Sequence, residues 1–447
     1  QQFPAPGLAV GTEPDPVEDD GQAGIEAMLG HHRRGMGTVM LDAEGRYPPA
    51  FGQGQGLAGT EEVRMQIMGD GGRADREEVG QPLDHPDLQP TLDLFLAHGV
   101  TTVRGLLGET GQLVLRQQLQ DGERDGPRVV LAGPSLNGNS VTDPEQAAAL
   151  VGEIHQAGFD LLKIHPGLDI PRFDAVMAAA RAHGMPVVGH VPEAVGLMHA
   201  LDRRMAGIEH MDDYVRALVP DDHRARTASP GFFGLLAVEA ADPDRIPVLV
   251  EATRAAGTAI SPTETLMRWM LGGEDVDDLL ARPEMVYVPG EVQARWRSQR
   301  GQIQSGPGFS RARADRFLDL RRQLLKALHD GGVPIVLGSD APQWFNVPGV
   351  SAHRELALMV EAGLTPWQAL RTGTVAAAAH LGAAGERGAV AAGQAADLVL
   401  LGCGQVGRAL LRRLHGQPAA ARLRLLAVAT SSRHLHAASG LVAGSAA

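Results

Sequence analysis

Cysteine and lysine are both scarce in this sequence. Cys403 is the only cysteine, which excludes an internal disulfide and a zinc site built from several cysteines. This scarcity leaves the compartment open, since either export with removal of a signal or a cytoplasmic location is compatible with it. The 40 basic residues include only two lysines, Lys163 and Lys326, and the others are arginines. A lysine at either position therefore calls for a specific explanation.

An excess of positive charge and long apolar runs are also missing. The net charge of -13 and the pI near 5.7 give no electrostatic basis for binding nucleic acid or an anionic membrane surface. No apolar run reaches the length of about eighteen residues that a membrane span needs, so we expect none. Because the first residue is Gln rather than Met, we expect a processed or trimmed N-terminus. These absences favour a protein that acts on a small molecule and are compatible with a homo-oligomer.

What the sequence does contain is an alternation of short β-type runs with longer helical patterns. Helical stretches such as 169–184 and 313–332 have apolar residues three or four positions apart and a closing Gly. This alternation predicts an α/β fold of βα units around a parallel sheet, and one further strand would complete a (β/α)8 barrel. The long charged segment 266–315 could form a lid over a site. The β-type runs are 100–103, 128–132, 161–164, 187–190, 207–210, 258–261 and 335–340.

Four of these runs carry a possible ligand at or near their C-terminal end: Lys163, His190, His210 and Asp340. The C-terminal strand ends of such a barrel converge on the active site. Imidazole and carboxylate suit zinc or a similar divalent ion, and Asp340 could act as both ligand and general base. Each residue alone also fits a structural role, as a core lysine paired with an acid, a hydrogen-bonded histidine or a turn cap. The joint arrangement favours a site.

Lys163 could supply chemistry that arginine cannot. A buried lysine can lose its proton, whereas arginine effectively cannot. The neutral amine could react with carbon dioxide to form a carbamate, an anionic oxygen ligand able to bridge two metal ions. The remaining histidines are weaker candidates, because among 17 histidines some will lie near a predicted strand end by chance. Those of little individual weight are His31, His32, His85, His98, His165 and His353.

The segments that hold these residues form an ordered set: FLAHGVTTVRG, DLLKIHPGL, MPVVGHVP, GIEHMDDY, VLGSDAP, HRELALMVEAGLTPWQALRTGT and GAVAAGQAADLVLL. The set covers about residues 90–401 and resembles the amidohydrolase superfamily, especially its imidazolonepropionase-like and prolidase-like members. The resemblance implies a (β/α)8 TIM-like barrel with a small β-sandwich formed from both chain ends. We therefore expect the sandwich to take residues 1–50 and 383–447, and the barrel to take 51–382.

The resemblance also implies roles for the candidate residues. By motif position, Lys163 is the carboxylated bridging residue, and His190 and His210 are metal ligands after the fifth and sixth strands. Asp340 is the ligand and proton shuttle after the eighth strand. The implied reaction is hydrolysis of an amide, peptide-like or cyclic amide C–N bond by metal-activated water, with one or two divalent ions, zinc first. The expected partner is a small-molecule or dipeptide-like substrate.

The first strand departs from this pattern, because the sequence contains no His-x-His. One alignment places Gln53 and Gln55 at the two ligand positions, and another places His85 near the second. A glutamine amide is a poor substitute for imidazole at zinc. A catalytically impaired or inactive protein of the same fold is therefore the alternative expectation.

The C-terminal tail departs as well. Gly402, Gly404 and Gly407 form a GxGxxG pattern between a strand-type run and a helical run, followed by a second strand-type run. This tail resembles the first βαβ unit of homoserine dehydrogenases. The second run ends without the acid that would bind an NAD ribose, and too few residues follow Ser432 for a complete nucleotide domain. An NAD(P)-linked oxidoreductase is thus the less favoured alternative.

Overall fold

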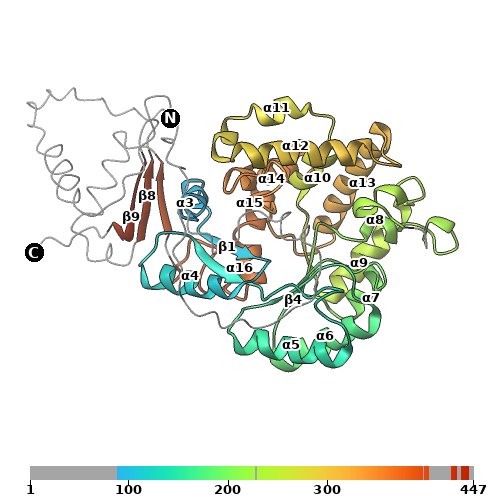
Figure 1. Ribbon diagram of the computed structural model, residues 1–447, viewed down its shortest axis with the longest axis horizontal. Coiled ribbons are helices and arrows are strands. Elements are labelled where there is room, and N and C mark those ends of the chain that lie inside the picture. The colour runs from blue at the N-terminus through green and yellow to red at the C-terminus, as the bar shows by residue number, and fades with distance from the viewer. Residues whose placement is uncertain (1–87, 227–228, 396, 402–423, 430–433, 442–447) are drawn as a thin grey trace, which may run out of the picture. The chain divides into compact units, whose positions relative to one another are not determined.

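The computed structural model describes residues 88–226, 229–395, 397–401, 424–429 and 434–441. All of them lie in the unit formed by Pro49–Ala447. Figure 1 shows short strands surrounded by helices, the α/β arrangement that the sequence predicts. Gln53, Gln55 and His85, the residues considered for the first strand, lie outside the described residues. The domain boundaries expected from the sequence stay a prediction.

The strands form parallel sheets in chain order. Strands β1 (Thr102–Gly105) and β2 (Arg128–Leu131) pair in parallel. Strands β3 (Leu162–Ile164), β4 (Val187–Gly189), β5 (Gly207–Glu209) and β6 (Ala259–Ser261) form a second, four-stranded parallel sheet. Six of the runs predicted from the sequence are therefore strands, each within two residues of its predicted bounds.

Isolated parallel bridges connect these sheets into one continuous series. The bridge between Ala132 and Leu161 joins the end of β2 to the start of β3, and the bridge between Ile260 and Ile335 adds the last predicted run after β6. The sequence predicts a strand over residues 335–340, but in the structure only Ile335 forms a bridge. The amide of Leu337 donates to the carbonyl of Thr372 at 3.1 Å, so the backbone there bonds to a helix end instead of a neighbouring strand.

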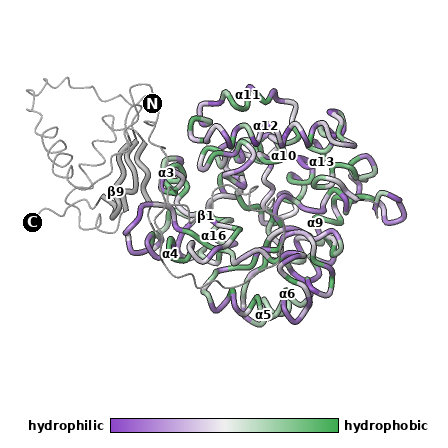
Figure 2. Tube along the Cα trace, viewed as in Figure 1, coloured by the Kyte–Doolittle hydropathy of each residue, from purple (hydrophilic) through white to green (hydrophobic). Residues whose placement is uncertain are grey.

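Helices follow the strands and cover them from outside. Figure 2 shows hydrophilic and hydrophobic stretches alternating along these helices, as expected for elements with one face on the core. The α-helices of the described residues are α3 (Gln89–Ala97), α4 (Thr110–Asp121), α5 (Pro144–Gln156), α6 (Ile170–His183), α7 (Leu197–Asp202), α8 (Tyr214–Ala217), α9 (Ile246–Ala256), α10 (Glu264–Leu271), α11 (Val276–Leu280), α12 (Gly290–Ser305), α13 (Arg311–Asp330), α14 (Val350–Glu361), α15 (Pro366–Thr372) and α16 (Val375–His380).

Helix α6 illustrates how the local sequence sets the ends of an element. The side chain of Asp169 accepts a hydrogen bond from the amide of Arg172 at 3.1 Å, which caps the helix N-terminus, and a proline follows in the first turn. Gly184 ends the helix with φ of 68°, a left-handed conformation that favours glycine. Between these ends, Phe173 and Val176 are among the residues of the helix that face the core.

The main core lies between the strands and the surrounding helices. Ile164, Ile208 and Ile260 are fully buried on β3, β5 and β6. Phe173 of α6 and Phe317 of α13 belong to the same apolar cluster and are also fully buried. Burial of apolar side chains on both faces accounts for the continuous apolar runs from which the strands were predicted.

The predicted lid region is helical. It contains α10, α11, the 3-10 segment Pro283–Tyr287 and α12, and Figure 1 shows α11 and α12 on the opposite side of the strands from α5 and α6. This region, here called the helical insert, spans residues 264–305. It has an apolar cluster of its own, distinct from the main core. The buried members are Trp269, Leu279, Met285, Trp296, Phe345 and Val347.

Hydrogen bonds tie the helical insert to the segment after the last predicted strand. Trp269 Nε1 donates to Asn346 Oδ1 at 2.9 Å, and Asn346 Nδ2 donates to the carbonyl of Ser339 at 2.6 Å. Asn346 is fully buried. The residue preceding Asp340 is therefore held by a side chain that also contacts the insert.

A further sheet comes from the C-terminal region. Strand β7 (Asp397–Leu401) pairs in parallel with β8 (Arg424–Ala429), which pairs antiparallel with β9 (His434–Leu441). The intervening residues 402–423, including the GxGxxG pattern, lie outside the described residues. The homoserine dehydrogenase resemblance and the β-sandwich stay predictions. Within the described ranges, no helix combines the length and apolar character needed to cross a membrane.

Candidate active site at the strand ends

The predicted site residues occupy adjacent parallel strands. Lys163 is the central residue of β3, His190 follows β4 directly, and His210 follows β5 directly. Asp340 lies five residues after Ile335 of the last extended run. Because the strands are parallel and neighbouring, their C-terminal ends lie along one edge.

Three of these side chains come together. The rings of His190 and His210 have centroids 4.8 Å apart. His210 Nε2 lies 3.9 Å from Asp340 Oδ2, with 5% and 33% of the two side chains exposed. Burial lowers the pKa of His210 well below its usual value, with His190 adding to the effect. Burial also raises the pKa of Asp340, against the opposing influence of Lys163. The arrangement favours a neutral His210 imidazole beside the Asp340 carboxyl group.

Hydrogen bonds orient both imidazoles through the same ring atom. His190 Nδ1 donates to the Asp212 carboxylate at 2.6 Å, which leaves Nε2 as the ring nitrogen available to a ligand. His210 Nδ1 bonds to Thr263 Oγ1 at 2.8 Å, and its Nε2 faces Asp340. Such support of the second ring nitrogen is the usual environment of a metal-binding histidine.

Lys163 is buried among charged groups. Burial lowers the pKa of Lys163, while Glu209 and Asp340 oppose this effect. Arg104 Nη2 donates to Glu209 Oε1 at 2.7 Å, and Arg104 Nη1 lies 3.0 Å from His380 Nε2. Burial alone would raise the pKa of Glu209, but Arg104 and Lys163 outweigh it and keep that pKa below its usual value. Glu209 is therefore a buried anion between Arg104 and Lys163.

The backbone turns sharply where the strands end. His210, Thr263 and Asp340 have φ values of 60°, 50° and 57°, in the left-handed region that non-glycine residues rarely adopt. Such strained residues persist only when the surrounding structure holds them, and they are concentrated at functional sites.

A buried ion pair holds the backbone on one side of the site. Arg321 of α13 donates from Nη1 to the carbonyl of His210 at 2.7 Å and from Nη2 to that of Pro262 at 2.8 Å. Its Nη2 also lies 2.6 Å from Glu264 Oε1. Glu355 accepts from the amide of Glu264 at 2.8 Å, and burial, aided by Glu264, raises the pKa of Glu355 to about 7.

Sequence reasoning missed His165, which the structure places in this site. Its ring centroid lies 5.2 Å from that of His190, and its Nδ1 lies 2.7 Å from Ser135 Oγ. Burial lowers the pKa of His165 to about 2, with Lys163 and His190 adding to the effect. The signal was available, because alternate residues of a strand point to the same face and His165 is two positions after Lys163.

The donor chemistry at this edge fits a divalent ion, although the described residues do not bring together three His, Cys, Asp or Glu side chains closely enough to hold one. The Asp212 contact leaves Nε2 of His190 available, and His210 Nε2 and Asp340 Oδ2 face each other. Asp340 also accepts a hydrogen bond from Gln343, which holds its carboxylate. Two imidazoles and a carboxylate are the ligand types that zinc prefers.

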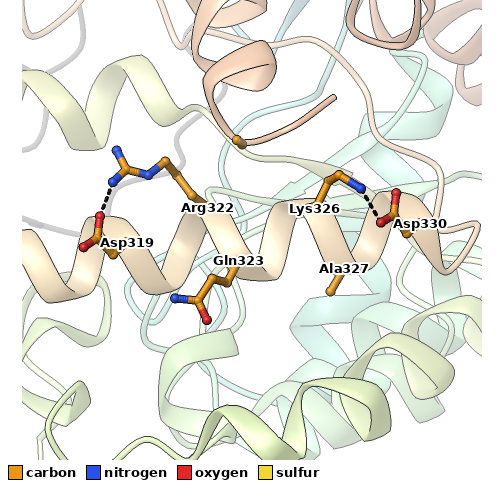
Figure 3. Close-up of a pocket in the computed structure, with 7 residues that line it drawn as sticks. Asp319, Arg322, Gln323, Lys326, Ala327 and Asp330 are labelled. Carbon is orange, nitrogen blue, oxygen red and sulfur yellow. Dashed lines mark hydrogen bonds and ion pairs between the residues drawn. The ribbon is translucent and has the colours of Figure 1, made fainter. Parts of the chain in front are cut away.

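A surface hollow on α13 is separate from these residues. Figure 3 shows its lining, where Arg322 bonds to Asp319 and Lys326 bonds to Asp330 along the same helix. The charged groups satisfy one another, and none comes from a strand end. Lys326, the second lysine of the sequence, is thus an ordinary surface residue.

Comparisons with known proteins support the family resemblance of the sequence. The sequence profile of the amidohydrolase family matches residues 92–421. The solved structure of a bottromycin amidohydrolase has 25% sequence identity and a TM-score of 0.50, with coverage of 66% of this chain and 64% of that one, less than two thirds of its length. No curated protein matches the sequence.

Two further solved structures are similar to this chain at lower identity. A Xaa-Pro dipeptidase with bound methionine in its active site has 19% identity and a TM-score of 0.46, covering 68% of this chain and 70% of the other. Molinate hydrolase has 18% identity and a TM-score of 0.47, covering 73% and 72%. Both TM-scores lie below 0.50, so neither similarity supports an inference about activity. The family match spans most of the sequence and includes every described candidate residue, and the chain belongs to the amidohydrolase family.

Proposed function

We propose that this chain is a metal-dependent hydrolase that cleaves an amide, peptide-like or cyclic amide C–N bond. One observation carries the proposal: His190, His210 and Asp340 meet at the C-terminal ends of parallel strands, with His210 Nε2 3.9 Å from Asp340 Oδ2. The proposed fold is a closed (β/α)8 barrel together with a small β-sandwich. Family membership and the parallel strand series support this fold.

His190 and His210 would hold the ion through Nε2, and Asp340 would hold it through Oδ2. Lys163, as a carbamate, would provide a bridging oxygen if two ions bind. When bound, a divalent ion such as zinc lowers the pKa of water and polarises a carbonyl group. Asp212 and Thr263 keep the two imidazoles oriented for this role.

Asp340 is the proposed general base and acid. Its carboxylate would take a proton from the attacking water and later deliver it to the leaving nitrogen. The raised pKa that burial gives Asp340 brings it nearer to neutral pH, which favours both transfers. Gln343 donates to the carboxylate and so fixes its direction.

The substrate is proposed to be a small molecule or a dipeptide-like amide. A panel of dipeptides, N-acyl amino acids and cyclic amides, incubated with the zinc-loaded chain, tests the proposal. Hydrolysis that stops on chelation and returns with zinc supports it. Bound metal without turnover favours a catalytically impaired protein, which the missing His-x-His supports. Protection against thermal unfolding by NAD(P) would instead favour the oxidoreductase alternative.

The carbamate proposal predicts that Lys163→Arg loses metal, because guanidinium keeps the positive charge but cannot be carboxylated. We expect metal affinity to fall by at least the roughly 10- to 100-fold that loss of a supporting residue costs. Metal analysis and 13C NMR after incubation with labelled bicarbonate provide the measurements. Lys326→Arg is the matched control, since Lys326 lies on the surface of α13 with 39% of its side chain exposed. Unchanged metal binding in Lys163→Arg would return Lys163 to a structural role.

The missing His-x-His motif gives a second prediction. If Gln53 and Gln55 occupy its positions, replacing both with His supplies two nitrogen donors, and we expect about one further equivalent of metal together with faster amide hydrolysis. Metal stoichiometry and turnover on the amide panel are measured. The Gln53→Ala, Gln55→Ala variant is the control, because it changes the same positions without adding donors. A folded His variant that gains neither metal nor activity would place the first strand elsewhere, with His85 as the next candidate.

A further inference from the structure

His165 is connected to a tight loop that follows β2. Ser135 Oγ lies 2.7 Å from His165 Nδ1, and Asn137 Nδ2 donates to the same Oγ at 3.0 Å. The orientation of the Asn137 amide is fixed, because Oδ1 accepts from the backbone amides of Asn139 at 2.8 Å and Ser140 at 3.0 Å. Asn137 is therefore the donor to Ser135.

These contacts favour one position for the proton of the neutral His165 ring. Asn137 already donates to Ser135 Oγ, and among the described residues His165 Nδ1 is the one acceptor within reach of the Ser135 hydroxyl proton, which favours donation from Ser135 to His165. A ring nitrogen that accepts has no proton of its own, so the neutral imidazole has its N–H at Nε2. In the described part of the chain, that N–H has no hydrogen-bond partner.

The backbone keeps this arrangement in place beside His190. The amide of His165 donates to the carbonyl of Leu136 at 2.9 Å, and the amide of Gly138 donates to that of Pro166 at 3.3 Å. The two loops approach so closely that a Cβ on Gly138 would lie 2.7 Å from the carbonyl oxygen of Gly167. His165 is thus a preorganised group whose ring lies 5.2 Å from that of His190.

We propose that His165 is a further catalytic residue, whose Nε2–H donates a hydrogen bond to the carbonyl oxygen of the scissile amide. This inference rests on the proposed function, because it requires an amide substrate at the strand ends. The hydrogen bond strengthens as negative charge develops on that oxygen during attack by water, so it stabilises the transition state more than the bound substrate. Ser135 is a positioning residue, since it acts only by fixing the tautomer.

The test compares variants on the best-cleaved amide of the panel. His165→Phe keeps a ring but removes the donor, and we expect kcat to fall about 100-fold, with KM changed by less than about threefold. His165→Gln keeps an N–H donor and should recover part of this loss. Ser135→Ala leaves the imidazole intact but frees its tautomer, and a smaller decrease in kcat is expected. His183→Phe, on the exposed surface of α6, is the control.

Nitrogen-15 NMR of the imidazoles gives a readout that does not depend on activity. The signals lost in His165→Phe should correspond to an Nε2–H tautomer in the wild-type chain. A tautomer protonated at Nδ1 overturns the inference. So does a folded His165→Phe or Ser135→Ala variant with wild-type kcat. If the wild-type chain cleaves no amide at all, the proposed function and this inference both fail, whereas turnover that survives without His165 contradicts the inference alone.

Discussion

Replacing both His190 and His210 with Ala is expected to remove bound divalent metal and to reduce amide hydrolysis to background. The two side chains would supply both nitrogen donors at the strand ends, and a single carboxylate retains zinc poorly. Metal analysis of the purified variant and turnover on the amide panel are the measurements. Loss of metal with retained folding would support the ligand roles of both histidines.

The chain offers a matched control for this double variant. His155 of α5 and His183 of α6 have ring centroids 4.7 Å apart, close to the 4.8 Å between His190 and His210, but both are exposed on outer helices. His155→Ala with His183→Ala should leave metal content and turnover unchanged. If the site variant keeps its full metal content, the ion lies elsewhere. If the control variant loses it, the metal is held by the surface pair.

Arg321→Met is expected to lower the free energy of unfolding by roughly 3–5 kcal/mol, because it leaves a buried carboxylate without its partner. The arginine and Glu264 have only 1% and 6% of their side chains exposed. The substitution also removes the donors to the carbonyls of His210 and Pro262. Urea denaturation followed by circular dichroism measures the loss.

The adjacent residue of α13 provides the comparison. Arg322 pairs with Asp319 at the surface, with 38% and 57% of the side chains exposed. Exposed ion pairs contribute about 0–1 kcal/mol, so Arg322→Met should be close to wild type. Equal stability of the two variants would mean that the buried pair contributes no more than the exposed one. A stable Arg321→Met variant with reduced turnover would instead indicate that Arg321 acts mainly on the His210 backbone.

Strand positions could be predicted because burial on both faces leaves a clear apolar pattern. Residues 187–190 and 207–210 were predicted as strands, and the structure places β4 and β5 there. The run 335–340 was predicted too long, because apolar composition does not reveal that the amide of Leu337 bonds to a helix end. The helical insert was predicted only as a long connection, since its separate apolar cluster depends on contacts between distant residues.

In the candidate site, too, some residues could be predicted from the sequence and others could not. His190, His210 and Asp340 could be placed together because parallel strands bring their ends to one edge. The residues that support them could not be predicted, because those contacts depend on which helix packs behind each loop. Arg321 reaches the backbone of His210 across 111 positions, and Glu355 reaches Glu264 across 91. The two-residue spacing between Lys163 and His165 predicts that both side chains lie on the same face, but a histidine considered without its neighbours does not show this.

The contact between the helical insert and the segment after Asp340 limits which residues can be exchanged between this chain and its relatives. Phe345 and Val347 belong to the apolar cluster of the insert, although they follow it by some forty positions in the sequence. Asn346 lies between them and bonds both to Trp269 and to the backbone next to Asp340. A chimera that transplants residues 264–305 alone would bring a foreign surface against these three side chains. The unit that can be swapped is therefore discontinuous, and it includes the loop that carries the proposed proton shuttle.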